Sequence, residues 1–375
     1  RRSSDLSIVF ENNDRPGIML AGAIRSYVNR WAVTPSQNVA IFTNNNDGHQ
    51  TARALLNKGV NVAAVIDTRD QKVKSPDYET FSDAVVSNTY GRRGLRSITI
   101  DHEDGTQRTL KCGALGVSGG WNPNIHLSSH HRGRPIWKES IQSFIPDDNC
   151  PSGMLVAGSA KGFMELEDVI KSGFGAIKQV LENLNVKPKN IDMPKVQGDV
   201  AQDIEPFWMV KGTSRGWVDQ QNDVTAKDIK LAKQENFTSV EHLKRYTTLG
   251  MATDQGKTAN ISGLAIMANL LGKPIPEVGT TIYRPPYTPT AIGTFAGRSR
   301  DKDFRPVRKT PSHRWAEEKG AVFVEVGMWM RAQWFPEKGE THWRQSVDRE
   351  VIQTRKSVGV CDVTTLGKVD VQGKD

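Results

Sequence analysis

Residues 240–257, with the sequence VEHLKRYTTLGMATDQGK, combine cations, hydroxyls and glycines at a spacing that suits the binding of an anion. Lysine and arginine can form charge-assisted hydrogen bonds with a phosphate, and a loop that opens a helix adds free backbone N–H groups. The alternative is an ordinary helical turn with solvated basic side chains, which is common beside a glycine turn. The candidate anion-binding residues are Lys244, Arg245, Thr247, Thr248, Gly250, Gln255 and Lys257.

Two helices are expected to position this stretch. Ser239 is typical of a helix N-cap, and Gly250 is typical of the residue that ends a helix. Residues 253–254 are a threonine and an aspartate that can cap a second helix, with Gly256 in its first turn. Further helices are predicted at residues 225–234 and 260–271, the second of them amphipathic, so the region reads as a small helical domain.

A second candidate site lies at residues 158–162, where the small-residue loop GSAKG follows a predicted strand at residues 154–157. A helix is predicted to begin at Glu165 and to continue toward Leu184. A strand, a glycine-rich loop and a helix N-terminus are the arrangement that faces a nucleotide cofactor in doubly wound folds. A plain tight turn is the alternative. The candidate cofactor-binding residues here are Gly158, Ser159, Ala160, Met164 and Leu166.

Residues 38–67 predict a parallel βαβ unit, with strands at 38–42 and 60–66 around a helix at 50–58. A dinucleotide site needs several glycines after the first strand, so that the backbone can approach the pyrophosphate. The turn at residues 43–48 is TNNNDG and holds a single glycine. We therefore predict that this unit folds but binds no nucleotide, and we give little weight to Asp67 as a ribose-binding acid. More strands are predicted at 84–93, 95–101 and 110–116.

From residue 280 the sequence predicts alternating extended and helical segments. Residues 280–289 contain three prolines, which exclude a regular helix, so an extended connector is expected there. Downstream we predict helices at 311–320 and 347–358 and strands at 321–326, 360–363 and 368–372. Both ends of the sequence read as cut, so we expect a fragment of a longer polypeptide.

The composition restricts the class of protein. The 375 residues carry a formal charge of +8 and suggest two or three domains. The positive charge is spread along the chain, which argues against a nucleic-acid-binding protein, and no apolar run reaches membrane-spanning length. Three scattered cysteines indicate a reducing, cytoplasmic compartment and offer no cluster for a metal. His126, His130 and His131 have no carboxylate or thiol beside them, so we predict surface or supporting histidines.

Five long motifs identify a family. KRYTTLGMATDQGK, FENNDRPGIMLAGA, SGGWNPNIHL, GTTIYRPPYTP and CDVTTLGKVDVQG resemble the alpha subunit of the heterotetrameric sarcosine oxidases, over essentially the whole chain. The resemblance implies an α/β protein with three domains. These are part of a Rossmann-like pyridine-nucleotide oxidoreductase domain at 1–184, a linker and small, mostly helical middle domain at 185–279, and a connector with the start of an α+β aminomethyltransferase (GcvT-like) domain at 280–375.

The resemblance also implies a function. Sarcosine would be oxidised at FAD on the beta subunit, and electrons would pass to an FMN at the alpha–beta interface and then to oxygen. The products would be glycine, hydrogen peroxide and either formaldehyde or methylene-tetrahydrofolate, with gamma and delta subunits completing the complex. This chain would house NAD beside residues 158–162, with the NAD glycine fingerprint before Arg1, and would supply residues 240–257 to FMN and its last domain to tetrahydrofolate. It offers no catalytic residue and no metal ligand.

Three alternatives remain open at this point. The first is a stand-alone folate-dependent aminomethyltransferase with an inert N-terminal extension. The second is a structural scaffold whose nucleotide fold is inactive. The third is a subunit of a related amine or proline dehydrogenase, against which the lack of clustered cysteines near residues 244–257 speaks.

Overall fold

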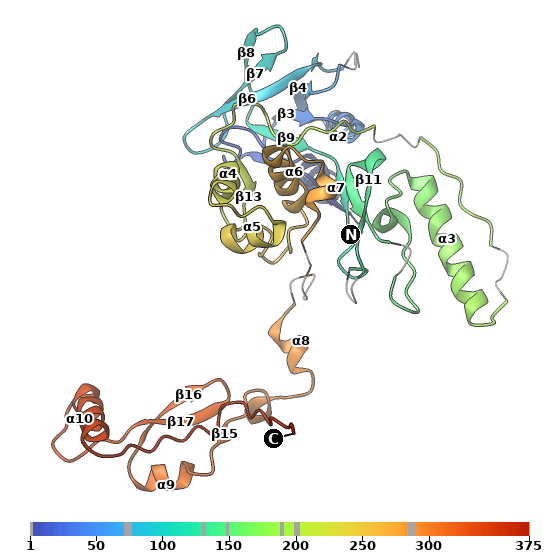
Figure 1. Cartoon of the computed structure of the whole chain (residues 1–375). Coiled ribbons are helices and arrows are strands. Elements are labelled where there is room, and N and C mark those ends of the chain that lie inside the picture. The colour runs from blue at the N-terminus through green and yellow to red at the C-terminus, as the bar shows by residue number, and fades with distance from the viewer. Residues whose placement is uncertain are drawn as a thin grey trace. The chain divides into compact units, whose positions relative to one another are not determined.

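The structure is a computed structural model, which describes residues 3–70, 77–129, 133–147, 150–187, 191–198, 203–281, 283, 288 and 290–374. Its contacts divide the chain into two compact units, Arg1–Pro289 and Thr290–Asp375. Helices and strands alternate through both units, which confirms the predicted mixed α/β class (Figure 1). No helix among the described residues is both long enough and apolar enough to span a membrane.

A five-stranded parallel sheet forms the centre of the first unit, with strands in the order β2-β9-β3-β4-β5. The strands are β2 (Ile18–Leu20), β3 (Asn38–Thr43), β4 (Asn61–Asp67), β5 (Thr80–Phe81) and β9 (Ala114–Ser118). Helices α1 (Ala21–Trp31) and α2 (Asn46–Leu56) connect the first three in chain order. Apolar side chains on both faces of the sheet are buried, as parallel sheets require. The β3–α2–β4 segment confirms the predicted βαβ unit.

Antiparallel strands accompany this sheet. Strands β6 (Ala84–Tyr90), β7 (Ser97–His102) and β8 (Gln107–Lys111) form one sheet, β1 (Ser3–Asp5) pairs with β10 (Trp121–Pro123), and β11 (Ile136–Lys138) pairs through η1 (Glu139–Ile141) with β12 (Ser143–Ile145). The prediction of one strand at 110–116 is wrong. The chain leaves one sheet at Lys111 and enters the parallel sheet at Ala114, because the Gly113 N–H donates to the Asn38 carbonyl instead of continuing the β7–β8 ladder.

A helical region follows in the same unit. It contains β13 (Trp217–Asp219), β14 (Val224–Thr225), α4 (Ala226–Gln234), α5 (Val240–Thr247), α6 (Asn260–Leu271) and α7 (Ile275–Val278). Thr225 and Asp228 form a capping box at the start of α4. Residues 260–268 of α6 are all buried, so the predicted amphipathic helix is instead the central helix of this region. Figure 1 shows α4, α5 and α6 gathered together, and their apolar side chains share one core.

The segment before α3 differs from its prediction. Residues 154–157 form no strand, and the loop after them is a 3₁₀ helix, η2 (Gly158–Lys161). The helix predicted from Glu165 is confirmed as α3 (Leu166–Asn183), with Glu165 as its N-cap. None of its residues is buried.

The second unit contains a three-stranded sheet in the order β15-β17-β16. Its elements are α8 (Ile292–Ala296), η3 (Asp301–Asp303), β15 (Arg308–Lys309), α9 (His313–Glu318), β16 (Val322–Val326), β17 (Trp329–Trp334) and α10 (Trp343–Lys356). The predicted helices and the strand at 321–326 are confirmed within a few residues. The strands predicted at 360–363 and 368–372 are wrong, because neither segment pairs with a strand in the described part of the chain.

Candidate cofactor sites

The turn between α5 and α6 is longer than the sequence predicts. Helix α5 ends with Thr248 in the left-handed region at φ 64°, and the Gly250 N–H donates to the buried Asp219 carboxylate over 2.8 Å. The second helix does not begin near residue 253. Asp254 instead accepts hydrogen bonds from the Gly256 and Thr258 N–H groups and closes a separate turn, so α6 starts only at Asn260.

The two glycines of this turn accommodate a side chain of the protein itself. A Cβ added at Gly250 or at Gly256 would lie 2.3 Å from Asn260 Oδ1, which is closer than any real contact. Both glycines also have positive φ, at 69° and 73°. The Asn260 amide therefore fills the space beside both glycines.

Three of the seven predicted anion ligands form hydrogen bonds with residues of α5. Thr247 Oγ1 donates to the Leu243 carbonyl over 2.8 Å, and Thr248 Oγ1 donates to the Thr247 carbonyl over 2.6 Å. Arg245 forms an ion pair with Glu241 one turn earlier, at 2.9 Å, while its side chain stays 55% exposed. Lys244 is buried. The two hydroxyls and the Arg245 guanidinium thus already have partners within the protein.

The turn at Gln255 and Lys257 contacts Asn122, which the sequence did not single out, and His126. Asn122 Nδ2 donates to the Lys257 carbonyl over 3.1 Å, and His126 Nε2 lies 3.4 Å from the Gln255 carbonyl. The His126 ring packs on the Tyr283 ring at a centroid distance of 4.0 Å. His126 is buried, so of the two predicted roles, surface or supporting histidine, the structure excludes the surface one for it, and His130 and His131 lie outside the described residues.

The charges around Lys257 favour the binding of an anion there. Burial, followed by the nearby Lys257 charge, lowers the pKa of His126 to about 4, so the imidazole is neutral at pH 7. Burial also lowers the pKa of Lys257, and this effect exceeds the opposite effect of the nearby Asp254 charge, which raises it. A lysine ammonium can form a charge-assisted hydrogen bond with an anion such as a phosphate. Lys257 thus fits one side of an anion site, whereas the Gln255 side-chain amide donates to the Ala252 carbonyl over 3.1 Å.

The second candidate site lies where η2 meets α3. The Gly158 N–H donates to Ser172 Oγ over 3.2 Å, so it does not face a ligand. Met164 lines a small cavity with Asn45, Gly120 and Trp121, and Leu166 is 54% exposed. Ser159 and Ala160 lie in η2, between Gly158 and Lys161. A larger cavity of about 540 Å³ lies beside them and is lined by side chains that include Asp147, Cys150, Lys161, Asp168, Lys171 and Ser172.

The start of α3 suits sugar hydroxyls better than a pyrophosphate. Its first turn carries Glu167 and Asp168, whose charges oppose an anion at the helix N-terminus. A carboxylate is, however, a good acceptor for ribose hydroxyls. Lys161 and Lys171 place positive charge on the wall of the same cavity. A volume near 540 Å³ is within the range of small-molecule sites, so the cavity fits part of a nucleotide.

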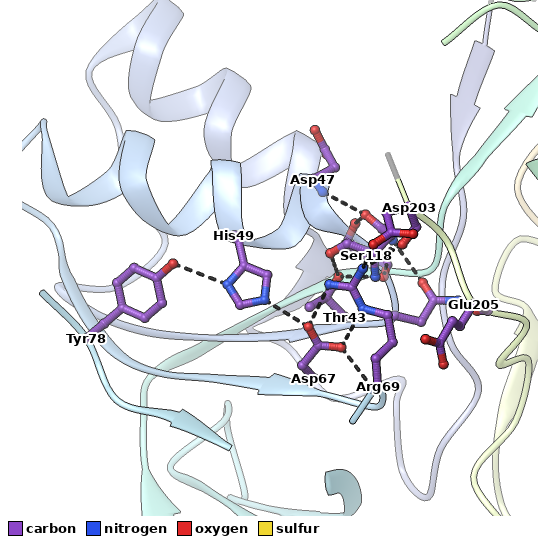
Figure 2. A network of polar contacts seen from close by, with 11 residues as sticks. Thr43, Asp47, His49, Asp67, Arg69, Tyr78, Ser118, Asp203 and Glu205 are labelled. Carbon is purple, nitrogen blue, oxygen red and sulfur yellow. Dashed lines mark hydrogen bonds and ion pairs between the residues drawn. The ribbon is translucent and has the colours of Figure 1, made fainter. Parts of the chain in front are cut away.

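A third polar cluster lies at the carboxyl ends of β3 and β4 (Figure 2). Asp67 Oδ2 lies 2.8 Å from His49 Nε2 and accepts from Arg69 Nη2 over 2.8 Å, and His49 Nδ1 lies 3.2 Å from the Tyr78 hydroxyl. Although burial opposes ionisation, hydrogen bonds from His49 and Arg69 hold the pKa of Asp67 below its usual range. Both oxygens of Asp67 are thereby engaged, which leaves no free acceptor for a ribose.

Comparison with known proteins adds a family to this geometry. The pattern of the sarcosine oxidase A3 domain matches residues 213–298, and that of the GCVT N-terminal domain matches residues 312–375. "Sarcosine oxidase subunit alpha" of Rhizobium meliloti (strain 1021) is 40% identical over 374 residues, which cover 98% of this chain and 38% of that protein. The protein of the same name from Corynebacterium sp. (strain P-1) is 35% identical over 395 residues, covering 98% and 40%.

The chain thus spans about two fifths of the length of the curated relatives it matches. Among solved structures, the L-proline dehydrogenase from P. horikoshii is similar in fold, with a TM-score of 0.56 at 18% identity. The similarity covers 78% of this chain and 56% of that one.

Proposed function

Because this chain belongs to the family of sarcosine oxidase alpha subunits, we propose that it forms part of the alpha subunit of an oxidoreductase that demethylates sarcosine. The observation that carries the proposal is the 35–40% identity, which extends over 98% of the chain. The complex would contain beta, gamma and delta subunits, with FAD and most of the sarcosine site on beta. The products would be glycine, hydrogen peroxide and either formaldehyde or 5,10-methylene-tetrahydrofolate.

Residues 240–257 would contribute the alpha side of an FMN site at the interface with beta. Bound FMN would supply electron transfer to oxygen. Within this chain, Lys257 would meet the phosphate, since its ammonium is partly desolvated and its backbone is held by Asn122. Arg245 is exposed and could turn from Glu241 toward the ligand. The engaged hydroxyls of Thr247 and Thr248 would shape the turn.

Lys257→Ala and Arg245→Ala test this assignment in the assembled complex. Each variant should assemble but lose FMN or pass electrons slowly to oxygen, while sarcosine still reduces FAD. Flavin content is measured by chromatography of the released cofactors, and turnover by oxygen consumption. Arg314→Ala is a matched control, because Arg314 also forms an exposed ion pair with a glutamate one helical turn away. Normal FMN content and turnover in both variants would refute the assignment.

The cavity between η2 and α3 would hold part of NAD, with Asp168 accepting from a ribose hydroxyl. Asp168→Asn should then reduce the NAD that co-purifies with the complex, because an amide is a weaker acceptor than a carboxylate. Glu182→Gln removes a carboxylate from the far end of the same helix and should leave NAD unchanged. Equal NAD content in the two variants would argue against this location.

The last domain would bind tetrahydrofolate, since the GCVT pattern matches residues 312–375. The whole proposal is tested by co-expressing the complete alpha subunit with its partner subunits, purifying the complex and measuring sarcosine-dependent oxygen uptake. A protein that purifies alone, contains no flavin and transfers one-carbon units to tetrahydrofolate would instead be a stand-alone aminomethyltransferase.

A further inference from the structure

The carboxyl ends of β3, β4 and β9 meet at one edge of the parallel sheet, beside the N-terminus of α2. In open α/β sheets this edge is where nucleotides bind, with the pyrophosphate on the helix N-terminus. In this protein, a distant segment of the chain, residues 203–205, lies at that edge. Figure 2 shows Asp203 and Glu205 beside the turn that joins β3 to α2.

Residues 203–205 form hydrogen bonds with one residue that follows β3 and one that follows β4. The Glu205 N–H donates to the Asn44 carbonyl over 3.1 Å, and Asn44 Nδ2 donates to the Glu205 carbonyl over 2.7 Å. On the β4 side, Arg69 Nη1 donates to the Asp203 carbonyl over 2.5 Å. Arg69 is fully buried, and its Nε and Nη2 are bonded to Asp67, so Nη1 is the group that could meet a nucleotide phosphate if the segment were absent.

The middle residue of the segment fills a space that a glycine leaves open. A Cβ at Gly120 would lie 2.3 Å from Ile204 Cδ1, and Gly120 has φ +107°. Gly120 lies just after β9, in the SGG sequence that ends this strand. The small residue after β9 therefore accommodates the chain's own isoleucine.

The turn between β3 and α2 also leaves no room for a phosphate. Asn45 Nδ2 donates to the Ser118 carbonyl over 3.0 Å, and Ser118 Oγ donates back to Asn45 Oδ1. Asp47, in the first turn of α2, is buried and paired with Arg25 at 2.9 Å. The helix N-terminus thus already faces a carboxylate, which opposes a second anion.

We propose that residues 203–205 are a built-in occupant of the nucleotide position of this sheet. They take the contacts that the pyrophosphate and ribose of a dinucleotide would use, and they exclude such ligands. The same contacts fasten the chain just before it enters the helical region, where Phe207 and Val210 join the core of the sheet and Met209 bridges to Val9. This inference does not depend on the cofactors proposed above.

Hydrogen exchange, read by mass spectrometry on the full chain, tests the proposal with Asn44→Ala. The variant removes the bond to the Glu205 carbonyl, so the Glu205 amide should exchange about five- to tenfold faster, as expected for one lost hydrogen bond. Exchange in β4 should stay unchanged. Asn61→Ala is the matched control, because Asn61 bonds the Asn38 side chain at the opposite end of the same strands.

Addition of ADP or NADP⁺ to the unaltered chain should leave exchange at residues 43–48 unchanged. Nucleotide-dependent protection of these residues would overturn the proposal, as would an unaltered Glu205 exchange rate in Asn44→Ala. If Asn44→Ala loosens β4, Glu205→Pro removes the other bond from the segment alone, and faster exchange of residues 207–210 is then the supporting result. Unchanged exchange of these residues would overturn the proposal.

Discussion

Replacement of Asp5 by asparagine should stabilise the protein in a pH-dependent way. Asp5 lies on β1 with its carboxyl group buried, and the Gly22 N–H of α1 donates to Oδ2 over 3.0 Å. No described residue donates a hydrogen bond to Oδ1. The charged groups that face it are Asp47 of α2 and Arg25 of α1. Burial, followed by repulsion from Asp47, raises the pKa of Asp5 from about 3.8 to about 8.

The sign of the effect follows from proton uptake. Between pH 4 and pH 8 the unfolded chain releases the Asp5 proton while the folded protein keeps it, so the free energy of unfolding falls as the pH rises. One pKa unit corresponds to about 1.4 kcal/mol, which gives a loss of at most about 4 kcal/mol at pH 7. Asparagine keeps an acceptor for Gly22 and has no proton to lose. Asp5→Asn should therefore gain up to this amount at pH 7 and nothing at pH 4.

Urea unfolding followed by circular dichroism, from pH 4 to pH 8, measures the difference. Asp14→Asn is the control, because it removes one carboxylate from an exposed position in the same unit. A difference between Asp5→Asn and the unaltered protein that does not change with pH would refute the reasoning. A loss of stability at pH 7 would refute it as well, since it would mean that the ionised carboxylate is well accommodated.

Three further measurements follow from the structure. Gly256→Ala should lower the free energy of unfolding by about 1–3 kcal/mol, because its φ is +73° and the new Cβ would meet the Asn260 side chain; urea unfolding measures this, and a loss below about 0.5 kcal/mol would contradict it. A thiol reagent should label the exposed Cys361 quickly and spare the buried Cys112, since burial raises the pKa of Cys112 to about 12; fast labelling of Cys112 in the folded protein would be the contrary result. The free energy of unfolding should fall as the pH falls from about 6.5 to 4, because His126 takes up a proton in the unfolded state before it does so in the folded state. In urea titrations, His126→Gln should abolish this part of the pH dependence. An unchanged pH profile in the variant would speak against this reasoning.

The β3–α2–β4 unit was predictable because its pattern is local. Residues 38–43 and 61–67 are nearly continuous apolar runs, and a helical period between them ends at Gly59, so periodicity and one turn signal suffice. The lack of nucleotide binding that the single glycine at residues 43–48 predicts stays a prediction. The helix α3 was found for the same local reason.

The missed features depend on contacts between distant residues. The start of α6 at Asn260 is set by the Asn260 amide between two glycines and by Asp254 closing its own turn, while the sequence offers residues 253–254 as an equally good cap. The position of His126 depends on Tyr283, far along the chain. Residues 154–157 read as a strand by composition, yet no neighbouring strand pairs with them in the part of the chain that the structure describes.

The strand order of the parallel sheet has a consequence for biosynthesis. β9 separates β2 from β3 in space, although it is made long after both, since it begins only at Ala114. At about 5–20 residues per second, the ribosome leaves the facing edges of β2 and β3 unpaired for several seconds. During this time the two strands must not pair with each other or with another nascent chain. Formation of the sheet is therefore expected to be slow and to finish with the insertion of β9.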